Sequence, residues 1–362
     1  MSIAVVAIGL LGVAAMIPLA HSKANRALRQ DRIAQFGRAA FREFHVREFD
    51  KPGSLDAPYW VSVYGLDDIY DPVTGRLIPQ LYCFDPLGLA ETDGGLSWFA
   101  SRFKRITVLS SRAEDLVSTN GQPAPYASLA ELKTAIDNGL RGGMATFNQT
   151  PLMQRGQARR CFELQDDVQF LREGNDRPVK SKFFTDLSGR NLRRESNGQL
   201  SWMATLAPKA VFERSRSSGI VRTKYANDHR YRMSVVIFEN RQPAIDLRPI
   251  SDDLKTRSLH FIRSDMTGSV KEAEIQSSHA RNIQKNDWVL FENGGHARND
   301  ALPLWHWYRV TYIDDKASDT EARSRLLRLE GPDWPGEPGR TVIGYYVPGV
   351  VAVYEKTIRL QP

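Results

Sequence analysis

The sequence predicts an α+β protein in which a long N-terminal helix, first membrane-spanning and then amphipathic, precedes a mostly antiparallel β-rich globular domain. Two observations support this class. Residues 3–20 carry no charge and continue without a linker into a segment with helical periodicity. From residue 200 onward, short segments rich in Val, Ile, Tyr, Phe and Trp alternate with polar turn residues, which is typical of a sandwich or barrel. We therefore expect a helix over 1–50, a mixed α+β part over 51–198 and a β-rich sandwich or barrel-like part over 199–362.

The uncharged run at residues 3–20 has 18 positions, the lower limit for a membrane-spanning helix. At about 1.5 Å per residue it covers about 27 Å, against a hydrocarbon core of about 30 Å. A proline inside the run is expected to kink the helix. The positions expected to span the membrane and take part in assembly are Ile3, Val6, Gly9, Leu10, Met16 and Pro18. A simple signal anchor is one alternative. A signal peptide is another, although no Lys or Arg precedes the run and its length exceeds a usual signal core.

The chain after residue 20 predicts a continuing, amphipathic helix that ends before Pro52 and Gly53. Its apolar residues recur at intervals of three and four, so they form one stripe. Exposed on a solvated helix, such a stripe would be an aggregation hazard. We expect it to pack lengthwise against the β-rich domain through Ile33, Phe36, Phe41 and Phe44, with Gly37 and Ala40 between them.

The segment 3–49 resembles the N-terminal helix of type IV pilins and type II secretion pseudopilins. The resemblance rests on the Ala-Ile-Gly-Leu core at residues 7–10, on Pro18 and on the Ala/Arg-rich continuation. In that family a basic leader ending in Gly and a Phe-Thr-Leu-x-Glu motif come first. Neither stands in this sequence, so Met1 is expected to be an internal methionine. The resemblance implies a single-pass inner-membrane protein whose large domain is periplasmic or extracellular. Membrane lipid and other pilin-like or secretion-system subunits would be its partners, and the size of the head favours a minor subunit.

The charges around the apolar run indicate the opposite orientation. Lys23, Arg26, Arg29 and Arg32 follow the run, and no basic residue precedes it. The positive-inside rule alone would therefore keep the large domain in the cytoplasm. Both orientations stay open at the level of the sequence.

The body of the chain predicts short strands and few helices. A helix is expected over 128–140, since Ser128 and Glu131 form a capping box, and another near 161–172. Residues 287–330 suggest a small barrel meander. Strands are expected at 59–64, 77–84, 106–109, 200–206, 231–239, 259–263, 270–275, 287–291, 304–313, 325–330, 341–347 and 350–360.

Composition excludes several function classes. The chain has 362 residues, with 41% apolar and 25% charged, which excludes a disordered chain and a multi-span membrane protein. A net charge of +7 from 49 basic and 42 acidic residues is too mild to indicate nucleic-acid binding. No HExxH, GxGxxG, Walker or GxSxG motif is present, so we expect neither an enzyme nor a cofactor or metal site.

Three local patterns each allow a functional and a structural interpretation. Asp67, Asp68 and Asp71 could hold calcium, but they lack a defined ligand spacing and read better as a solvated turn. The aromatic run at residues 305–308 is either an exposed strip for a glycan or protein partner or, preferably, a strand with a buried face. Cys83 and Cys161 either form a disulfide in an exported domain or are two independent buried thiols.

These observations lead to one expected function and one alternative. The first is a membrane-anchored structural subunit similar to a minor type IV pilin or pseudopilin, which assembles through its N-terminal helix. The alternative is a single-pass anchored envelope protein whose barrel-like module binds a ligand or protein. A membrane-anchored enzyme ranks below both, because no catalytic constellation is visible.

Overall fold

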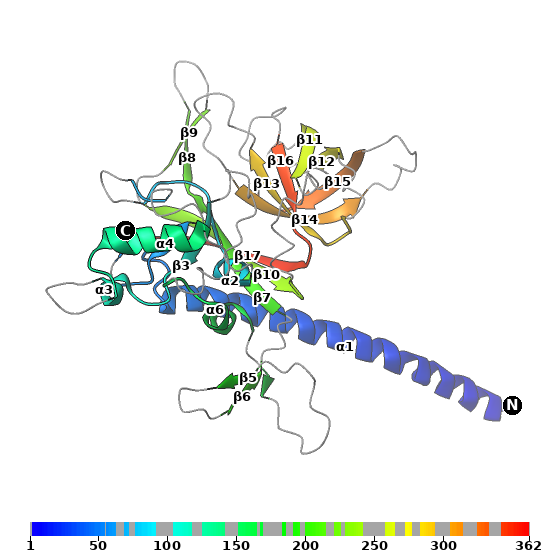
Figure 1. Cartoon of the computed structure of the whole chain (residues 1–362). Coiled ribbons are helices and arrows are strands. Elements are labelled where there is room, and N and C mark those ends of the chain that lie inside the picture. The colour runs from blue at the N-terminus through cyan, green and yellow to red at the C-terminus, as the bar shows by residue number, and fades with distance from the viewer. Residues whose placement is uncertain are drawn as a thin grey trace.

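The computed structural model joins one long helix, a central sheet and a barrel (Figure 1). It describes residues 2–54, 56–62, 69–71, 77–91, 104–117, 125–141, 151–164, 167–168, 183–185, 191–195, 200–214, 221–225, 229–241, 258–264, 272–276, 283–293, 305–313, 324–332 and 342–361. The class is the α+β arrangement that the sequence predicts, with predominantly antiparallel sheets.

The central sheet has six strands and takes them from both halves of the chain. Their spatial order is β1 (Trp60–Ser62), β3 (Lys104–Val108), β2 (Tyr82–Phe84), β7 (Leu200–Pro208), β10 (Arg230–Glu239) and β17 (Val350–Arg359). All neighbours are antiparallel except β2 and β3. β2 pairs with β7, from Tyr82 opposite Leu206 to Phe84 opposite Ala204. The sheet therefore contains strands from both sides of the expected domain boundary at residue 198.

A closed six-stranded barrel is inserted between β10 and β17, which are neighbours in the central sheet. The barrel extends well beyond the expected meander at 287–330. Its strands, in spatial order, are β11 (Ser258–Ser264), β12 (Glu272–Gln276), β15 (Ser324–Glu330), β14 (Trp305–Ile313), β13 (Trp288–Asn293) and β16 (Val342–Tyr346). Closure pairs every barrel strand on both sides, so no edge strand remains.

Smaller elements surround these units. Two further sheets consist of β4 (Asp167–Val168), β6 (Asn191–Glu195) and β5 (Phe183–Thr185), and of β8 (Ala210–Arg214) and β9 (Val221–Tyr225). The short helices are α2 (Pro86–Glu91), α3 (Ala113–Leu116), α4 (Leu129–Arg141) and α6 (Arg155–Phe162). Ser128 caps α4 as predicted, because its Oγ accepts from the backbone N–H of Glu131 at 3.2 Å. The second bond of a capping box is shifted by one residue, since the Glu131 carboxylate accepts from the N–H of Ala127 at 2.7 Å. The helix expected near 161–172 instead begins at Arg155 and ends at Phe162.

The long helix α1 (Ser2–Val46) lies on one face of the central sheet and the barrel lies on the other (Figure 1). Side chains of β7 alternate between the two faces, and all nine of its residues are buried. The central sheet is thus the middle layer of the molecule, which explains why β7 is buried on both faces.

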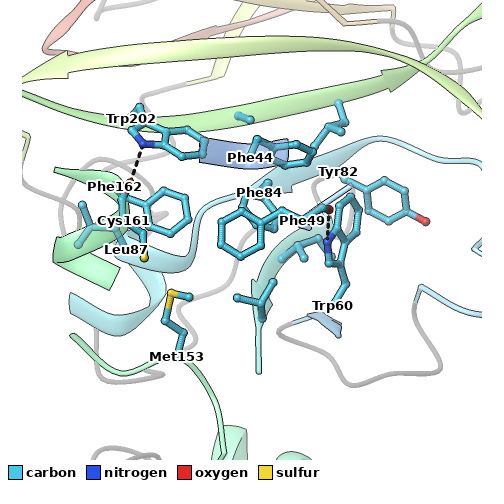
Figure 2. Packing of buried hydrophobic residues seen from close by; sticks show 14 of the residues in the cluster. Phe44, Phe49, Trp60, Tyr82, Phe84, Leu87, Met153, Cys161, Phe162 and Trp202 are labelled. Carbon is cyan, nitrogen blue, oxygen red and sulfur yellow. Dashed lines mark hydrogen bonds between the residues drawn. The ribbon is translucent and has the colours of Figure 1, made fainter. Parts of the chain in front are cut away.

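The main core is an aromatic cluster between α1 and the sheet (Figure 2). The Phe84 ring centroid lies 5.3 Å from that of Phe44, 5.1 Å from that of Phe49 and 5.5 Å from that of Trp60. Two buried indoles keep their hydrogen bonds: Nε1 of Trp60 donates to the Phe49 carbonyl and Nε1 of Trp202 to the Cys161 carbonyl, each at 3.0 Å. Burying aromatic area while satisfying both N–H groups makes this cluster the main link between helix and sheet.

Candidate functional site

The candidate site is α1, whose two halves have different environments. The helix is continuous over 45 residues, about 67 Å at about 1.5 Å per residue. Its C-terminal half lies along the sheet, and its N-terminal half projects away from the rest of the molecule (Figure 1). The helix runs on through Pro18.

The predicted apolar stripe is the face that contacts the sheet. Ile33, Phe36, Ala40 and Phe44 are all buried in the main core. Phe41 lies at the rim of this cluster and is only partly buried, less than the sequence suggests. Gly37 allows a close approach, because a Cβ there would overlap the ring of Tyr354 on β17. The missing side chain therefore lets the helix pack directly against this ring.

The helix ends at Val46, before Pro52 and Gly53 as predicted. Glu48 has a positive φ of 57°, the N–H of Phe49 donates to the Phe44 carbonyl at 3.0 Å, and that of Glu48 donates to the His45 carbonyl at 3.0 Å. This is a Schellman cap, and the accompanying apolar contact is that between Phe44 and Phe49. The cap turns the chain so that Phe49 enters the core beside the helix.

The projecting half carries large apolar side chains that nothing covers. Met16, Ile17, Leu19 and Leu28 are between 58% and 69% exposed. Of the positions expected in the membrane span, Met16 and Pro18 are exposed, whereas the side chains of Ile3, Val6, Gly9 and Leu10 lie outside the described residues.

In the part of the chain that the structure describes, no helix combines the length and the apolar character needed to cross a membrane.

Basic residues follow Met16, Ile17 and Leu19 on the projecting half. Lys23 and Arg26 are exposed and form no ion pair with any residue that the structure describes. Arg29 pairs through Nη2 with Oε2 of Glu239, at the end of β10. This ion pair marks the point at which the helix leaves the sheet.

The aromatic run at residues 305–308 is buried, so the interpretation as an exposed binding strip is wrong. Trp305 and Trp307 face the central sheet, and Nε1 of Trp307 donates to Oγ1 of Thr205 at 3.0 Å. Tyr308 belongs to the separate core of the barrel. The strand is covered on both faces because the barrel docks on the sheet through its outer wall.

His306 of the same run contacts the central sheet through a charged partner. Nη1 of Arg232 on β10 lies 2.5 Å from Nδ1 and 3.0 Å from Nε2 of His306. Burial of the imidazole, reinforced by the nearby guanidinium charge, lowers the pKa of His306 to about 3. The ring is therefore neutral at physiological pH and can accept a hydrogen bond from Arg232.

A buried carboxylate between two arginines lies at the end of β2. Asp85 is fully buried and accepts hydrogen bonds from Arg105 at 2.6 and 3.2 Å, and from Arg241 at 2.9 and 2.6 Å. It also caps α2, since the Gly88 N–H donates to Oδ1 at 3.0 Å. Burial opposes ionisation, but the charges of Arg241 and Arg105 outweigh it and hold the pKa of Asp85 well below its usual range.

The cluster around Asp85 has a structural role. Gly88 has no room for a side chain, because a Cβ would overlap the guanidinium of Arg105 and the carboxylate of Asp85. The arginines come from β3 and from the segment that leaves β10 toward the barrel. The carboxylate therefore joins three segments of the chain, and its oxygens are already occupied by protein donors.

The two cysteines do not form the disulfide that was one of the sequence alternatives. Both are free and buried. Cys83 points to the face of the sheet that carries the barrel, whereas Cys161 lies in the core on the helix side. The sheet separates them, because side chains along β2 alternate between faces and Tyr82 and Phe84 occupy the helix side.

The described residues contain no group of three or more His, Cys, Asp or Glu side chains that could hold a metal ion. Of the acidic turn, Asp67 and Asp68 lie outside the described residues, and Asp71 is described.

Sequence reasoning missed the charged contacts around Asp85 and Arg232. One local signal was present, because an Asp followed by Pro is a common start of a helix, with Asp as the cap and Pro at the first helical position. The arginine partners lie 20 and 156 residues away from Asp85. No local pattern indicates contacts at such separations.

Comparison of the chain with protein-family models, with curated proteins and with solved structures gives no match.

Proposed function

We propose that the protein is a membrane-anchored structural subunit, similar to a minor type IV pilin or pseudopilin, which assembles through its N-terminal helix. The observation that carries this proposal is the division of α1 into a half packed on the sheet and a half that projects with exposed apolar side chains. In this proposal the uncharged residues 3–20 are held in the inner membrane and the sheet and barrel lie in the periplasm or outside the cell.

The energetics of the projecting half support an anchor or assembly role. Full burial of a large apolar side chain is worth about 1.5–3 kcal/mol relative to leaving it in water. The isolated chain does not gain that stabilisation at its exposed side chains Met16, Ile17, Leu19 and Leu28. Lipid or the helices of neighbouring subunits would supply it, and these are the partners that we propose.

The alternative function is a single-pass anchored protein whose barrel binds a ligand or another protein. One observation favours it: the barrel has its own core, and it lies on the face of the sheet opposite α1. In both functions α1 is an anchor. They differ in whether the projecting half also contacts other subunits.

Membrane fractionation tests the anchor. Gly9→Asp combined with Gly12→Asp is expected to release the protein, because each acidic residue at the centre of a span costs about 2.5–3.5 kcal/mol. Ala24→Asp combined with Ala27→Asp is the matched control, since it adds the same charges at the same spacing beyond the uncharged run. Retention of the Gly9/Gly12 variant in the membrane fraction would contradict a spanning helix.

Cross-linking separates assembly from simple anchoring. A Leu28→Cys variant places a reactive thiol on the exposed surface of α1, while the native thiols are buried. Assembly predicts cross-linked species in membranes after mild oxidation. A variant that stays monomeric under the same conditions would favour the anchored binding module.

A further inference from the structure

We infer that Lys23 and Arg26 form a basic collar on α1 that binds the phosphate groups of anionic phospholipids. The inference rests on the proposed function, because it requires the uncharged residues 3–20 to occupy the hydrocarbon core. It extends the proposed function by naming the class of lipid that the anchor prefers. The collar is defined here as Lys23 and Arg26 alone.

The position of the collar along the helix matches the headgroup layer. That layer is about 5–8 Å thick on each side of the hydrocarbon core. At about 1.5 Å per residue, Lys23 stands about 4.5 Å and Arg26 about 9 Å beyond Ala20, the last residue of the uncharged run. Their flexible side chains can extend toward the bilayer, so both charges reach the phosphate level.

The collar residues are the cations on this part of the helix that are available to a ligand. Both are exposed and have no ion-pair partner among the residues that the structure describes. Arg29 is engaged by Glu239, and Arg32 is half-buried beside the sheet. The helix thus offers two free positive charges directly next to exposed Met16, Ile17 and Leu19.

This combination fits a lipid surface better than a soluble acidic partner. A soluble acidic peptide would need the charges but would leave the neighbouring apolar side chains in water. A bilayer with anionic headgroups satisfies both, since the apolar side chains enter the core while each basic residue near the surface gains electrostatic attraction. Charge complementarity therefore selects anionic over zwitterionic phospholipid.

The test measures lipid binding to the full chain in non-ionic detergent. The purified protein is titrated separately with phosphatidylglycerol and with phosphatidylcholine, and native mass spectrometry gives the apparent Kd of each. The wild type is expected to prefer phosphatidylglycerol. Lys23→Gln combined with Arg26→Gln is expected to reduce that preference roughly 30-fold, which corresponds to about 2 kcal/mol at about 1.4 kcal/mol per factor of ten.

The matched control is Arg38→Gln combined with Arg42→Gln. These two residues are exposed on the same helix, but they lie about 27 and 33 Å beyond Ala20, several Debye lengths from the proposed headgroups. Removing them changes the net charge by the same amount and is expected to leave the lipid preference unchanged. A comparable loss in this control would mean that overall charge, and not the collar, sets the preference.

The outcomes distinguish this inference from the proposed function. Equal Kd values for the two lipids in the wild type, or an unchanged preference in the Lys23/Arg26 variant, would overturn the collar while leaving the anchor intact. Failure of the wild type to bind either lipid, together with its absence from the membrane fraction, would overturn the anchor itself.

Discussion

At the scale of single residues, the two thiols show how burial controls reactivity. Burial, reinforced by the Asp85 charge, raises the pKa of Cys83 to about 12. Burial likewise raises the pKa of Cys161 to about 11. Because the thiolate is the reactive form, both groups are protonated and unreactive at neutral pH.

We predict that a thiol reagent labels neither cysteine in the native protein and labels both in denaturant without added reductant. The first result follows from burial and the second from the absence of a bond between Cys83 and Cys161. Mass spectrometry of the labelled chain measures both. A denatured, unreduced chain that takes up no label would indicate a disulfide and contradict this structure.

His306 couples stability to pH through the contact between barrel and sheet. Its pKa is about 3 in the folded chain, against about 6.5 when unfolded. The unfolded state therefore binds the proton first, so stability is complete above pH 6.5 and falls as the pH drops toward 3. The loss at pH 5 is about 2 kcal/mol, from about 1.4 kcal/mol per pH unit.

We predict that His306→Phe flattens the dependence of unfolding free energy on pH between 7 and 5. The phenylalanine has no proton to gain, so the decrease of about 2 kcal/mol should disappear. Denaturant unfolding at each pH measures it. Asp85 changes the pH dependence of the unfolding free energy only at lower pH. Its stabilising effect is present above the unfolded pKa and is lost as the pH falls below that value. An unchanged slope in the variant would show that another group titrates.

At the scale of elements, α1 contributes to the stability of the sheet that it covers. Its stripe supplies side chains to the same cluster as β2 and β7. Phe44 has no exposed surface and contacts Phe84, whereas Phe41 is only partly covered. The two phenylalanines stand on one helix, three residues apart, and differ mainly in burial.

We predict that Phe44→Ala destabilises the protein by about 3–5 kcal/mol and that Phe41→Ala costs clearly less. The reason is the larger cavity that the fully buried ring leaves behind. Tryptophan fluorescence during denaturant unfolding reports the change, because Trp60 and Trp202 lie in the same cluster. Equal midpoints for wild type and Phe44→Ala would mean that the helix is a free stalk.

At the scale of the whole molecule, three layers are held together by apolar contacts and a few buried charges. The helix and the barrel dock on opposite faces of one sheet. Asp85 links β2 and α2 to β3 and to Arg241, near the point at which the chain leaves the sheet for the barrel. Removing one member of a buried charged cluster is costly because its partners are left uncompensated.

We predict that Asp85→Asn lowers the free energy of unfolding by about 3–5 kcal/mol. Glu91→Gln is the matched control, because Glu91 also pairs with two arginines, Arg155 and Arg159, but its side chain is 17% exposed. The Glu91 pairs are more open to solvent, which screens them, so a smaller loss is expected than for Asp85. Denaturant midpoints of the two variants provide the comparison, and equal losses would show that burial of Asp85 does not set its contribution.

The sequence by itself determined the elements whose signals are local. The helical period of the stripe at residues 33–44, the helix cap at Ser128 and the alternating strands after residue 200 all correspond to elements of the structure. These signals are read within a few residues of chain, because apolar periodicity and cap chemistry depend on near neighbours.

Only the tertiary structure decided which faces meet. The insertion of the barrel between β10 and β17, the burial of the aromatic run at residues 305–308 and the separation of Cys83 from Cys161 all follow from packing on both faces of the sheet. The contacts of Asp85 and His306 join positions up to 156 residues apart. Such contacts depend on the global arrangement of layers, and a single sequence carries no periodic or local signal for them.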